Sequence, residues 1–317
     1  MRVEDRHFPL SDFEKAEAQA ARGNAALARM PVALLRHHVL THLEEFRNPP
    51  GIVFPPEPEL ARELTEDRLE LPGEPAPVRL TVIRPTGEAP VSRPLVYFIH
   101  GGGFMGGDSR LNATLMRLLA DRTGSVVASV DYNVAPEAKF PTALRECQAG
   151  LAHVIGHGEY GVDAERVFLL GESAGGNLAA ALAITAQAER PCRPRGQILI
   201  YPVTDMDKLD SPSYHDDGPE FRTMYQFMHV ARDCYLPDKA TRRDPLATLL
   251  YAEFDGPQPD ALVMVAERDG LRDDGLRYAE KLAAAGGHVR AVVYRGARHA
   301  FINNLGRSPT ADDAAAE

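Results

Sequence analysis

The segment Gly-Glu-Ser-Ala-Gly-Gly at residues 171–176 follows directly after the run Arg-Val-Phe-Leu-Leu at residues 166–170. This order predicts a strand that turns sharply into a helix, with Ser173 in a strained bend and its hydroxyl free for nucleophilic attack. Gly171 and Gly175 are expected where side chains would collide as the backbone doubles back. The alternative is an ordinary strand-to-helix turn, but the alanine-rich residues 177–186 form helices well and supply the surroundings that a nucleophile requires.

A second glycine-rich segment, His100-Gly-Gly-Gly-Phe104, follows another apolar run at residues 95–99. Attack on an ester carbonyl places negative charge on oxygen, and preorganised N–H groups can stabilise that charge. The N–H groups of Gly102, Gly103 and Ala174 are therefore predicted to form an oxyanion hole. A flexible loop or a phosphate-binding turn is the alternative, although no Gly-Lys-Ser/Thr follows. We expect His100 to anchor the loop by hydrogen bonds.

A serine nucleophile needs a base that is oriented by a third group, and candidates for that third group follow in the sequence. Residues 261–269 have the composition of a buried strand that ends in carboxylates, with Asp269 at its tip. Asp273 and Asp274 stand where the N-cap of a helix at residues 276–285 is expected, and Glu267 is a candidate supporting group. Asp269 is therefore the predicted acid.

The candidate base is His299, which lies in a loop after a further predicted strand at residues 289–294. The order serine, acid, histidine, each just past the end of a strand, is the chain order of α/β hydrolases. Most histidines have structural or surface roles, and we adopt that interpretation for eight others: His37, His38, His42, His153, His157, His215, His229 and His288.

Taken together, these motifs resemble the hormone-sensitive-lipase-like family of α/β-hydrolase esterases, in its bacterial, acetyl-esterase-like form. The resemblance extends over about residues 76–305 and includes three further segments: Asp-Tyr-Asn-Val-Ala-Pro-Glu at 131–137, Asp-Gly-Leu-Arg-Asp-Asp-Gly at 269–275 and His-Ala-Phe at 299–301. It implies Ser173 as nucleophile, Asp269 as acid and His299 as base. Glu172 and Gly270 depart from the family's more frequent residues. The family's complete terminal helix also contrasts with residues 311–317, which suggests a shortened end.

The large type-B carboxylesterases share the serine motif, but they are far longer than this chain of 317 residues. Eight predicted strands, at residues 68–71, 78–84, 95–99, 126–131, 167–170, 197–201, 262–266 and 289–294, alternate with helices in the later part of the chain. This alternation predicts a mostly parallel sheet of eight strands flanked by helices, and the resemblance implies that the sheet has the α/β-hydrolase fold. Functional residues then gather at the carboxyl ends of the strands.

Two segments lie outside this alternation. Residues 1–50 are charged and helix-like, and residues 205–245 interrupt the sheet as an insertion; we expect both to form a helical cap on a catalytic core at 51–204 and 246–317. By resemblance, such a cap shapes the acyl pocket, for which the candidates are Phe104, Met105, Met206, Tyr214 and Met224. Each of these side chains has an equally plausible role in packing alone.

The balance of 35 basic and 45 acidic residues leaves a net charge of about −10, which argues against a nucleic-acid partner. The first residues lack a signal-peptide core, and no apolar run approaches ~18 residues, so we expect a cytoplasmic protein without a membrane span. Three widely spaced cysteines, Cys147, Cys192 and Cys234, fit reduced thiols. No metal or cofactor is implied.

The reaction expected from these residues is ester hydrolysis through an acyl-enzyme. The resemblance implies small-molecule esters with short, acetyl-like acyl groups as substrates, and a monomer or homodimer. An amidase or deacetylase with the same triad is a chemically close alternative. A non-catalytic ligand-binding relative is a further alternative, which the retained His299 makes less favoured.

Overall fold

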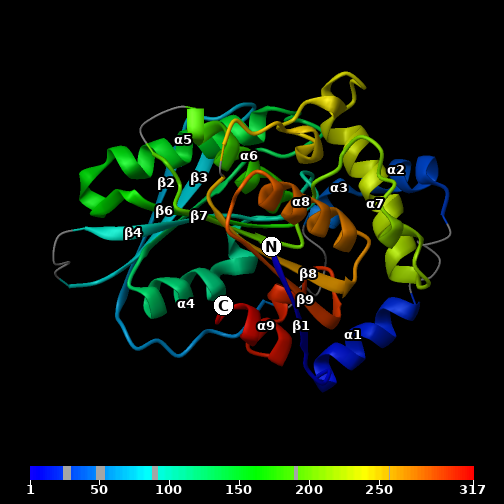
Figure 1. The fold of residues 1–317 in the computed structure, drawn as a ribbon, viewed down its shortest axis with the longest axis horizontal. Helices are drawn as coiled ribbons and strands as arrows, with labels where there is room; N and C mark the ends of the chain where they lie inside the picture. Colours follow the sequence, from blue (N-terminus) through cyan, green and yellow to red (C-terminus); the bar gives the residue numbers. More distant parts are fainter. Residues whose placement is uncertain (24–29, 48–53, 88–91, 189–191, 257) are drawn as a thin grey trace.

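The computed structural model describes residues 1–23, 30–47, 54–87, 92–188, 192–256 and 258–317 (Figure 1). Within these ranges, nine strands form one sheet in the order β1-β9-β8-β7-β6-β4-β5-β3-β2. The β2–β3 and β3–β5 pairs are antiparallel, and the other neighbouring pairs are parallel. This mostly parallel open sheet confirms the predicted fold class.

The eight predicted strands are all present, as β2 to β9, and most of them are longer than expected. With the additional strand β1, the strands are β1 (Arg2–His7), β2 (Leu64–Leu71), β3 (Val78–Pro85), β4 (Arg93–Ile99), β5 (Val126–Asp131), β6 (Val162–Glu172), β7 (Gly196–Ile200), β8 (Asp260–Arg268) and β9 (Val289–Arg298).

The α-helices in the described ranges are α1 (Asp12–Gly23), α2 (Val32–Thr41), α3 (Leu43–Arg47), α4 (Ala113–Thr123), α5 (Thr142–Gly156), α6 (Ala174–Ala188), α7 (Pro219–Tyr235), α8 (Arg272–Ala284) and α9 (Pro309–Ala314). Short 3₁₀ helices are η2 (Ser109–Asn112), η3 (Gly158–Tyr160), η4 (Pro212–His215), η5 (Thr241–Arg243), η6 (Leu249–Tyr251) and η7 (Phe301–Asn304). None of the described helices is both long enough and apolar enough to cross a bilayer.

The ninth strand, β1, corrects the expectation that residues 1–50 are helical throughout. It lies parallel to β9 at the edge of the sheet. Its sequence is polar at almost every position, so it lacks the apolar alternation by which a strand is recognised. Backbone pairing holds it instead, together with ion pairs from Glu4 to Arg290 and from Asp5 to Arg295. Charged side chains are common on edge strands because they discourage further pairing.

Two layers of helices enclose the sheet (Figure 1). Helices α5, α6 and α8 pack on one face and α4 and α9 on the other. Side chains of β4 alternate between two buried clusters, with Leu95, Tyr97 and Ile99 in one and Val96 and Phe98 in the other. Successive side chains of a strand point to opposite faces of the sheet, so a strand that is buried on both faces has apolar residues at every position. This explains why residues 95–99 form a continuous apolar run.

The segments expected to form a cap lie together at one end of the molecule. Helix α7, from the insertion at 205–245, contacts α1 and α2 from the N-terminal segment (Figure 1). The boundary placed between residues 50 and 51 lies outside the described residues. The division into cap and catalytic core remains a prediction.

Candidate active site

Ser173 occupies the turn between β6 and α6 with a positive φ of 57°, a conformation that costs energy for a residue other than glycine. Its backbone is held on both sides, because its N–H donates to the Ile200 carbonyl (2.9 Å) and its carbonyl accepts from the Val203 N–H (3.1 Å). These bonds tie the turn to the segment that follows β7.

The glycines flanking Ser173 are required by close backbone contacts. A Cβ atom on Gly171 would lie 2.1 Å from the Gly175 carbonyl oxygen. A Cβ atom on Gly175 would lie 2.1 Å from the Ile99 carbonyl oxygen, at the end of β4. Both separations are far below van der Waals contact, so the tight turn and its approach to β4 exclude any side chain.

The glycine loop that follows β4 lies beside Ser173. Gly102 and Gly103 have positive φ angles of 113° and 63°. Among the described residues, their N–H groups have no hydrogen-bond acceptor. Ala174 is the first residue of α6, where the N–H has no acceptor within the helix. Gly102 and Gly103 line the cavity described below, whereas Ala174 is buried at the start of α6.

His299 bridges Ser173 and Asp269. Its Nε2 lies 2.9 Å from Ser173 Oγ, and its Nδ1 lies 2.6 Å from Asp269 Oδ2. Asp269 is buried, and its second oxygen, Oδ1, accepts from the Leu271 N–H at 3.0 Å. The three residues predicted as nucleophile, base and acid, separated by up to 126 positions, therefore form one hydrogen-bonded chain.

The charges around His299 favour its protonated form. Burial lowers the pKa of the imidazole, but the charge and hydrogen bond of Asp269, and the charge of Glu172, outweigh burial and raise that pKa above its ordinary value. Glu172 is itself buried, which raises the pKa of its carboxyl group. Its Oε1 accepts from the Gly101 N–H at 2.7 Å, so it joins the serine turn to the glycine loop.

His100 has structural contacts, as expected. Its Nδ1 lies 2.7 Å from the Gly101 carbonyl oxygen, and its ring stacks on Tyr132 with centroids 4.2 Å apart. The Tyr132 hydroxyl donates to the His100 carbonyl at 3.0 Å. These contacts hold the start of the glycine loop.

The N-cap position expected for Asp273 and Asp274 is corrected by the structure. Helix α8 begins at Arg272, four residues earlier than predicted, and its N-cap residue is Leu271. Asp273 and Asp274 therefore lie in the first turn, and their carboxylates bond to Ser213 and Ser211 of the insertion. At the start of the helix the Arg272 N–H donates to the Asp269 carbonyl (3.1 Å), and the Asp273 N–H donates to Ser213 Oγ of the insertion (3.2 Å).

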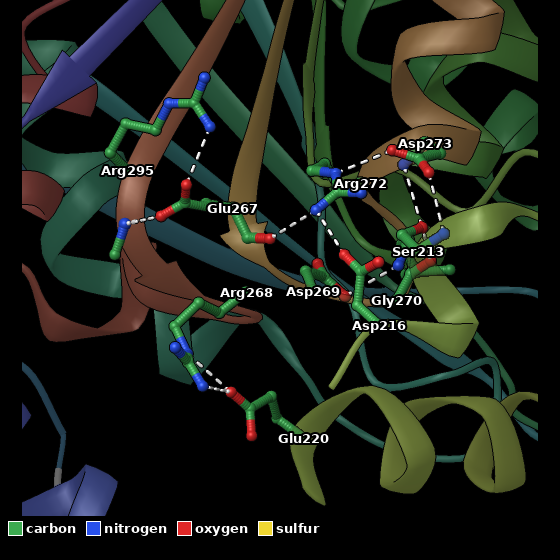
Figure 2. Close-up of polar contacts among 12 residues, drawn as sticks. Ser213, Asp216, Glu220, Glu267, Arg268, Asp269, Gly270, Arg272, Asp273 and Arg295 are labelled. Carbon is green, nitrogen blue, oxygen red and sulfur yellow. Dashed lines mark hydrogen bonds and ion pairs between the residues drawn. The ribbon is translucent and has the colours of Figure 1, made fainter. Parts of the chain in front are cut away.

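Glu267, the third neighbouring carboxylate, faces β9 (Figure 2). It accepts from the Gly296 N–H and from Arg295, each at 2.8 Å. The Gly296 hydrogen bond, with further help from Arg295, lowers the pKa of the Glu267 carboxyl despite partial burial. Its two partners hold the ends of β8 and β9 together on the side away from Ser213.

A cavity of about 240 Å³ opens onto Ser173 and His299. The glycine loop forms one wall. Phe227 of the insertion lines the cavity, and so do five side chains that were not predicted from the sequence, namely Arg47, Asp108, Leu111, Asn112 and Asn303. Asp108 and Asn112 follow the glycine loop closely, which is a usable signal. Nothing local points to Arg47, which comes from α3 and donates to the carbonyls of Met105 (2.9 Å) and Ala135 (3.1 Å).

The five predicted pocket residues lie elsewhere than the described lining of this cavity. Phe104 stacks on Tyr235 with ring centroids 4.3 Å apart. Met105, Met206 and Tyr214 are buried in the main core, and Met224 is partly buried against it. Apolar side chains beside a catalytic motif turn into the core because burial removes them from water.

In the described part of the chain, no group of three or more His, Cys, Asp or Glu side chains is arranged to hold a metal ion. The polar side chains of Ser173, His299 and Asp269 form one chain of hydrogen-bond donors and acceptors, and the N–H groups of the glycine loop lie beside it. This arrangement can transfer a proton between Ser173 and His299 and can place N–H groups on a developing negative charge.

Comparisons with known proteins agree with this geometry. Residues 96–303 match the model of a family described as having the alpha/beta hydrolase fold. The chain is 34% identical over 233 residues to an ethyl acetate hydrolase of Pseudomonas putida, covering 73% of this chain and 72% of that protein. It is 36% identical over 177 residues to the hormone-sensitive lipase of Mus musculus, covering 52% of this chain and 23% of the lipase.

A solved structure resembles this chain over most of its length. The hyperthermophilic esterase from the archaeon Pyrobaculum calidifontis superposes with a TM-score of 0.77 at 31% sequence identity. The match covers 97% of this chain and 96% of that one. The likeness therefore includes the N-terminal helices and the insertion as well as the sheet.

Proposed function

Because the chain belongs to the hormone-sensitive-lipase-like family of α/β-hydrolase-fold carboxylic ester hydrolases, we propose that it cleaves short-chain acyl esters through a Ser173–His299–Asp269 triad. The observation that carries this proposal is the pair of hydrogen bonds on His299, 2.9 Å to Ser173 Oγ and 2.6 Å to Asp269 Oδ2. Serine hydrolysis needs the base between nucleophile and acid in this order.

In the first step, Ser173 Oγ attacks the carbonyl carbon of the ester while His299 Nε2 takes the hydroxyl proton. The electron pair of the carbonyl bond moves onto oxygen, and His299 becomes an imidazolium. Asp269 remains ionised, accepts the hydrogen bond that His299 Nδ1–H donates, and stabilises the imidazolium charge. The bond between Asp269 Oδ1 and the Leu271 N–H keeps the other oxygen engaged, so that Oδ2 is directed at His299.

The tetrahedral oxyanion is proposed to accept hydrogen bonds from the N–H groups of Gly102, Gly103 and Ala174. Each such donor contributes about 3 kcal/mol to transition-state stabilisation in serine hydrolases. Gly102 and Gly103 are suited to this role for two reasons. Their positive φ angles let the backbone turn tightly, and both residues line the same cavity as Ser173.

Collapse of the intermediate breaks the bond to the alcohol oxygen, which receives the proton from His299 Nε2 and leaves. The acyl group remains on Ser173. His299 then takes a proton from water, the resulting hydroxide adds to the acyl carbon, and the second tetrahedral intermediate releases the acid as Ser173 regains its proton. In the net reaction, the ester and water give the carboxylic acid and the alcohol.

Two observations support short acyl groups. The cavity at Ser173 has a volume of only about 240 Å³, and the bulky ring of Phe227 lies against Gly103 within it. A relative that is 34% identical to this chain over 233 residues is an ethyl acetate hydrolase. A small cavity favours small substrates because a longer chain must leave part of its apolar surface in water.

The test is hydrolysis of p-nitrophenyl esters from acetate to octanoate by the wild-type chain and by Ser173→Ala. The proposal expects turnover that depends on Ser173 and a kcat/KM that is highest for the shortest acyl groups. Turnover that survives in Ser173→Ala would overturn the triad. A kcat/KM that rises steadily toward octanoate would overturn the substrate class and leave the triad standing.

A further inference from the structure

The loop that carries Asp269 is bound by a part of the chain about sixty residues earlier. We refer to residues 267–273, from the last two residues of β8 into the first turn of α8, as the acid loop. Side chains of residues 213–220, within the insertion, contact it: Ser213 and Asp216 from α8's end of the loop and Glu220 at Arg268 (Figure 2). The insertion therefore touches the residues on both sides of Asp269.

Ser213 is the central contact between these two segments. It is completely buried in η4. Its hydroxyl donates to the Gly270 carbonyl at 2.6 Å and accepts from the Asp273 N–H at 3.2 Å. Its own N–H donates to Asp273 Oδ2 at 2.8 Å. The hydroxyl thus uses both its donor and an acceptor site on the acid loop.

This arrangement replaces a helix cap that α8 lacks. The N-cap residue, Leu271, has no side-chain oxygen, so it cannot bond to the first N–H groups of the helix. The reciprocal bonds between Ser213 and Asp273 are those of a capping box, but the serine comes from a distant segment. The start of α8 therefore depends on a residue of the insertion.

Other contacts between the two segments are more exposed. Arg272 bonds to Asp216 at 2.8 Å and to the Glu267 carbonyl at 3.2 Å, and Arg268 pairs with Glu220 (Figure 2). Solvent-exposed ion pairs of this kind contribute ~0–1 kcal/mol each. A buried hydroxyl that satisfies buried backbone groups contributes more, because its loss leaves those groups unpaired.

We infer that Ser213 is a positioning residue that holds Asp269 in the orientation required to bond to His299. Gly270, to which Ser213 donates, is the next residue after Asp269, and Asp273 lies in the first turn of the helix that follows. With both held, the loop presents Asp269 Oδ1 to the Leu271 N–H and Oδ2 to His299. This inference rests on the proposed function, because it concerns the geometry of the same triad.

The inference predicts a change at His299 that a general loss of stability would not produce. The titratable groups that act on His299 are Asp269 at the end of β8 and Glu172 at the end of β6. If the acid loop loosens, the attraction from Asp269 weakens while the burial of the imidazole persists. The pKa of His299 then falls toward the value that burial and the remaining charge of Glu172 set together.

The experiment compares Ser213→Ala and Ser213→Thr with the wild-type chain. Tyr251→Phe is the matched control, because it removes one hydroxyl bond, 2.8 Å to Asp207, away from the acid loop. Asp269→Asn marks the full effect of losing the carboxylate. Each variant is assayed for kcat and KM on p-nitrophenyl acetate from pH 5 to 9, and the histidine ring is titrated by NMR with ¹³C-labelled histidine.

For Ser213→Ala we expect kcat to fall about tenfold or more with KM nearly unchanged, since displacing a catalytic group by a fraction of an ångström impairs the transition state. The acidic limb of the kcat/KM profile and the titration midpoint of His299 should both move to lower pH, by less than in Asp269→Asn. Ser213→Thr, which keeps the hydroxyl, should restore both, and Tyr251→Phe should behave as wild type.

The inference is overturned if Ser213→Ala retains the wild-type midpoint of His299, or if Ser213→Thr fails to restore it. Should Ser213→Ala melt below the assay temperature, Ser213→Cys, which keeps the size but weakens the hydrogen bonds, is measured in the same way. A wild-type chain without ester turnover would instead refute the proposed function. The NMR titration would still decide whether Ser213 controls the contact between Asp269 and His299.

Discussion

Glu172 Oε1 accepts a hydrogen bond from the Gly101 N–H at 2.7 Å, so a buried carboxylate connects the residue before Ser173 to the first glycine of the loop after His100. The contact is close enough that a Cβ atom on Gly101 would lie 2.4 Å from the same oxygen. Glu172 thereby sets the spacing between the serine turn and the glycine loop, and it adds negative charge near His299.

Replacing Glu172 with glutamine tests the charge separately from the contact, because the amide oxygen can still accept from Gly101. The charge of Glu172 raises the pKa of His299, although less than Asp269 does. We expect the acidic limb of kcat/KM to move to lower pH in Glu172→Gln, by less than in Asp269→Asn. An unchanged limb would contradict the assigned influence of this charge. Glu172→Ala, which leaves the Gly101 N–H without its acceptor, should lower kcat further than Glu172→Gln.

Removal of the nucleophile should nearly abolish turnover. We expect Ser173→Ala to lower kcat by at least about 10⁴-fold, as for serine-hydrolase triads in general. Active-site titration with a fluorophosphonate, which reacts only with an activated serine, should label the wild-type chain and leave the variant unlabelled. Labelling of Ser173→Ala at the wild-type rate would place the nucleophile elsewhere.

The two neighbouring carboxylates should differ in their effect on the reaction. Asp269→Asn should lower kcat by about 10⁴-fold, because an amide at this position orients His299 in the wrong tautomer. Asp273→Asn should cost much less, since Asp273 bonds to Ser213 and Arg272 and has no contact with His299 among the described residues. Steady-state kinetics on the acetate ester distinguish the two. A larger loss in Asp273→Asn would show that the acid has been assigned to the wrong residue.

Gly175 should tolerate no side chain. In Gly175→Ala the new Cβ atom would lie 2.1 Å from the Ile99 carbonyl oxygen, so β4 and the serine turn would have to separate. We expect a loss of about 3 kcal/mol or more in the free energy of unfolding. Gly158→Ala is the control, because nothing lies within 4 Å of a Cβ atom there, and it should change stability by about 0.5 kcal/mol or less. Denaturant unfolding measures both, and similar values would refute the steric argument.

Asp274 should make the stability of the chain depend on pH. Burial is the main cause that raises the pKa of this carboxyl to about 7; the charge of Asp205 adds to it, while Ser211, Arg277 and Tyr214 oppose it. The folded-state pKa lies above the unfolded value of about 3.9, so the folded state holds the proton more tightly. The contribution of protonated Asp274 to the free energy of unfolding is complete below about pH 4, and it is lost as the pH rises toward 7.

Asp274→Asn should therefore stabilise the chain at pH 8 relative to wild type, by a few kcal/mol in order of magnitude, and much less at pH 5. Thermal unfolding at the two pH values measures the difference. Asp260→Asn, at an exposed carboxylate, serves as the control and should shift Tm equally at both. The same shift of Tm at both pH values in Asp274→Asn would contradict the assigned titration.

Sequence alone predicted the α/β-hydrolase fold and eight of the nine strands of the described sheet. It also predicted the residues that the structure brings into hydrogen-bond contact, Ser173, Asp269 and His299. These features could be predicted because their causes are local. A buried strand needs a short apolar run, and the bend at Ser173 needs glycines at 171 and 175, whatever surrounds it.

Only the tertiary structure decided which distant segments complete the site. The edge strand Arg2–His7, the cavity wall from Arg47 and the cap that Ser213 supplies to α8 leave no local pattern, because each depends on a partner sixty to nearly three hundred residues away. Polar side chains such as these are fixed by partners that only the packed chain brings near, among them backbone groups that burial leaves without a local partner. Which groups those are is a property of the packed chain, so the sequence around each residue does not reveal it.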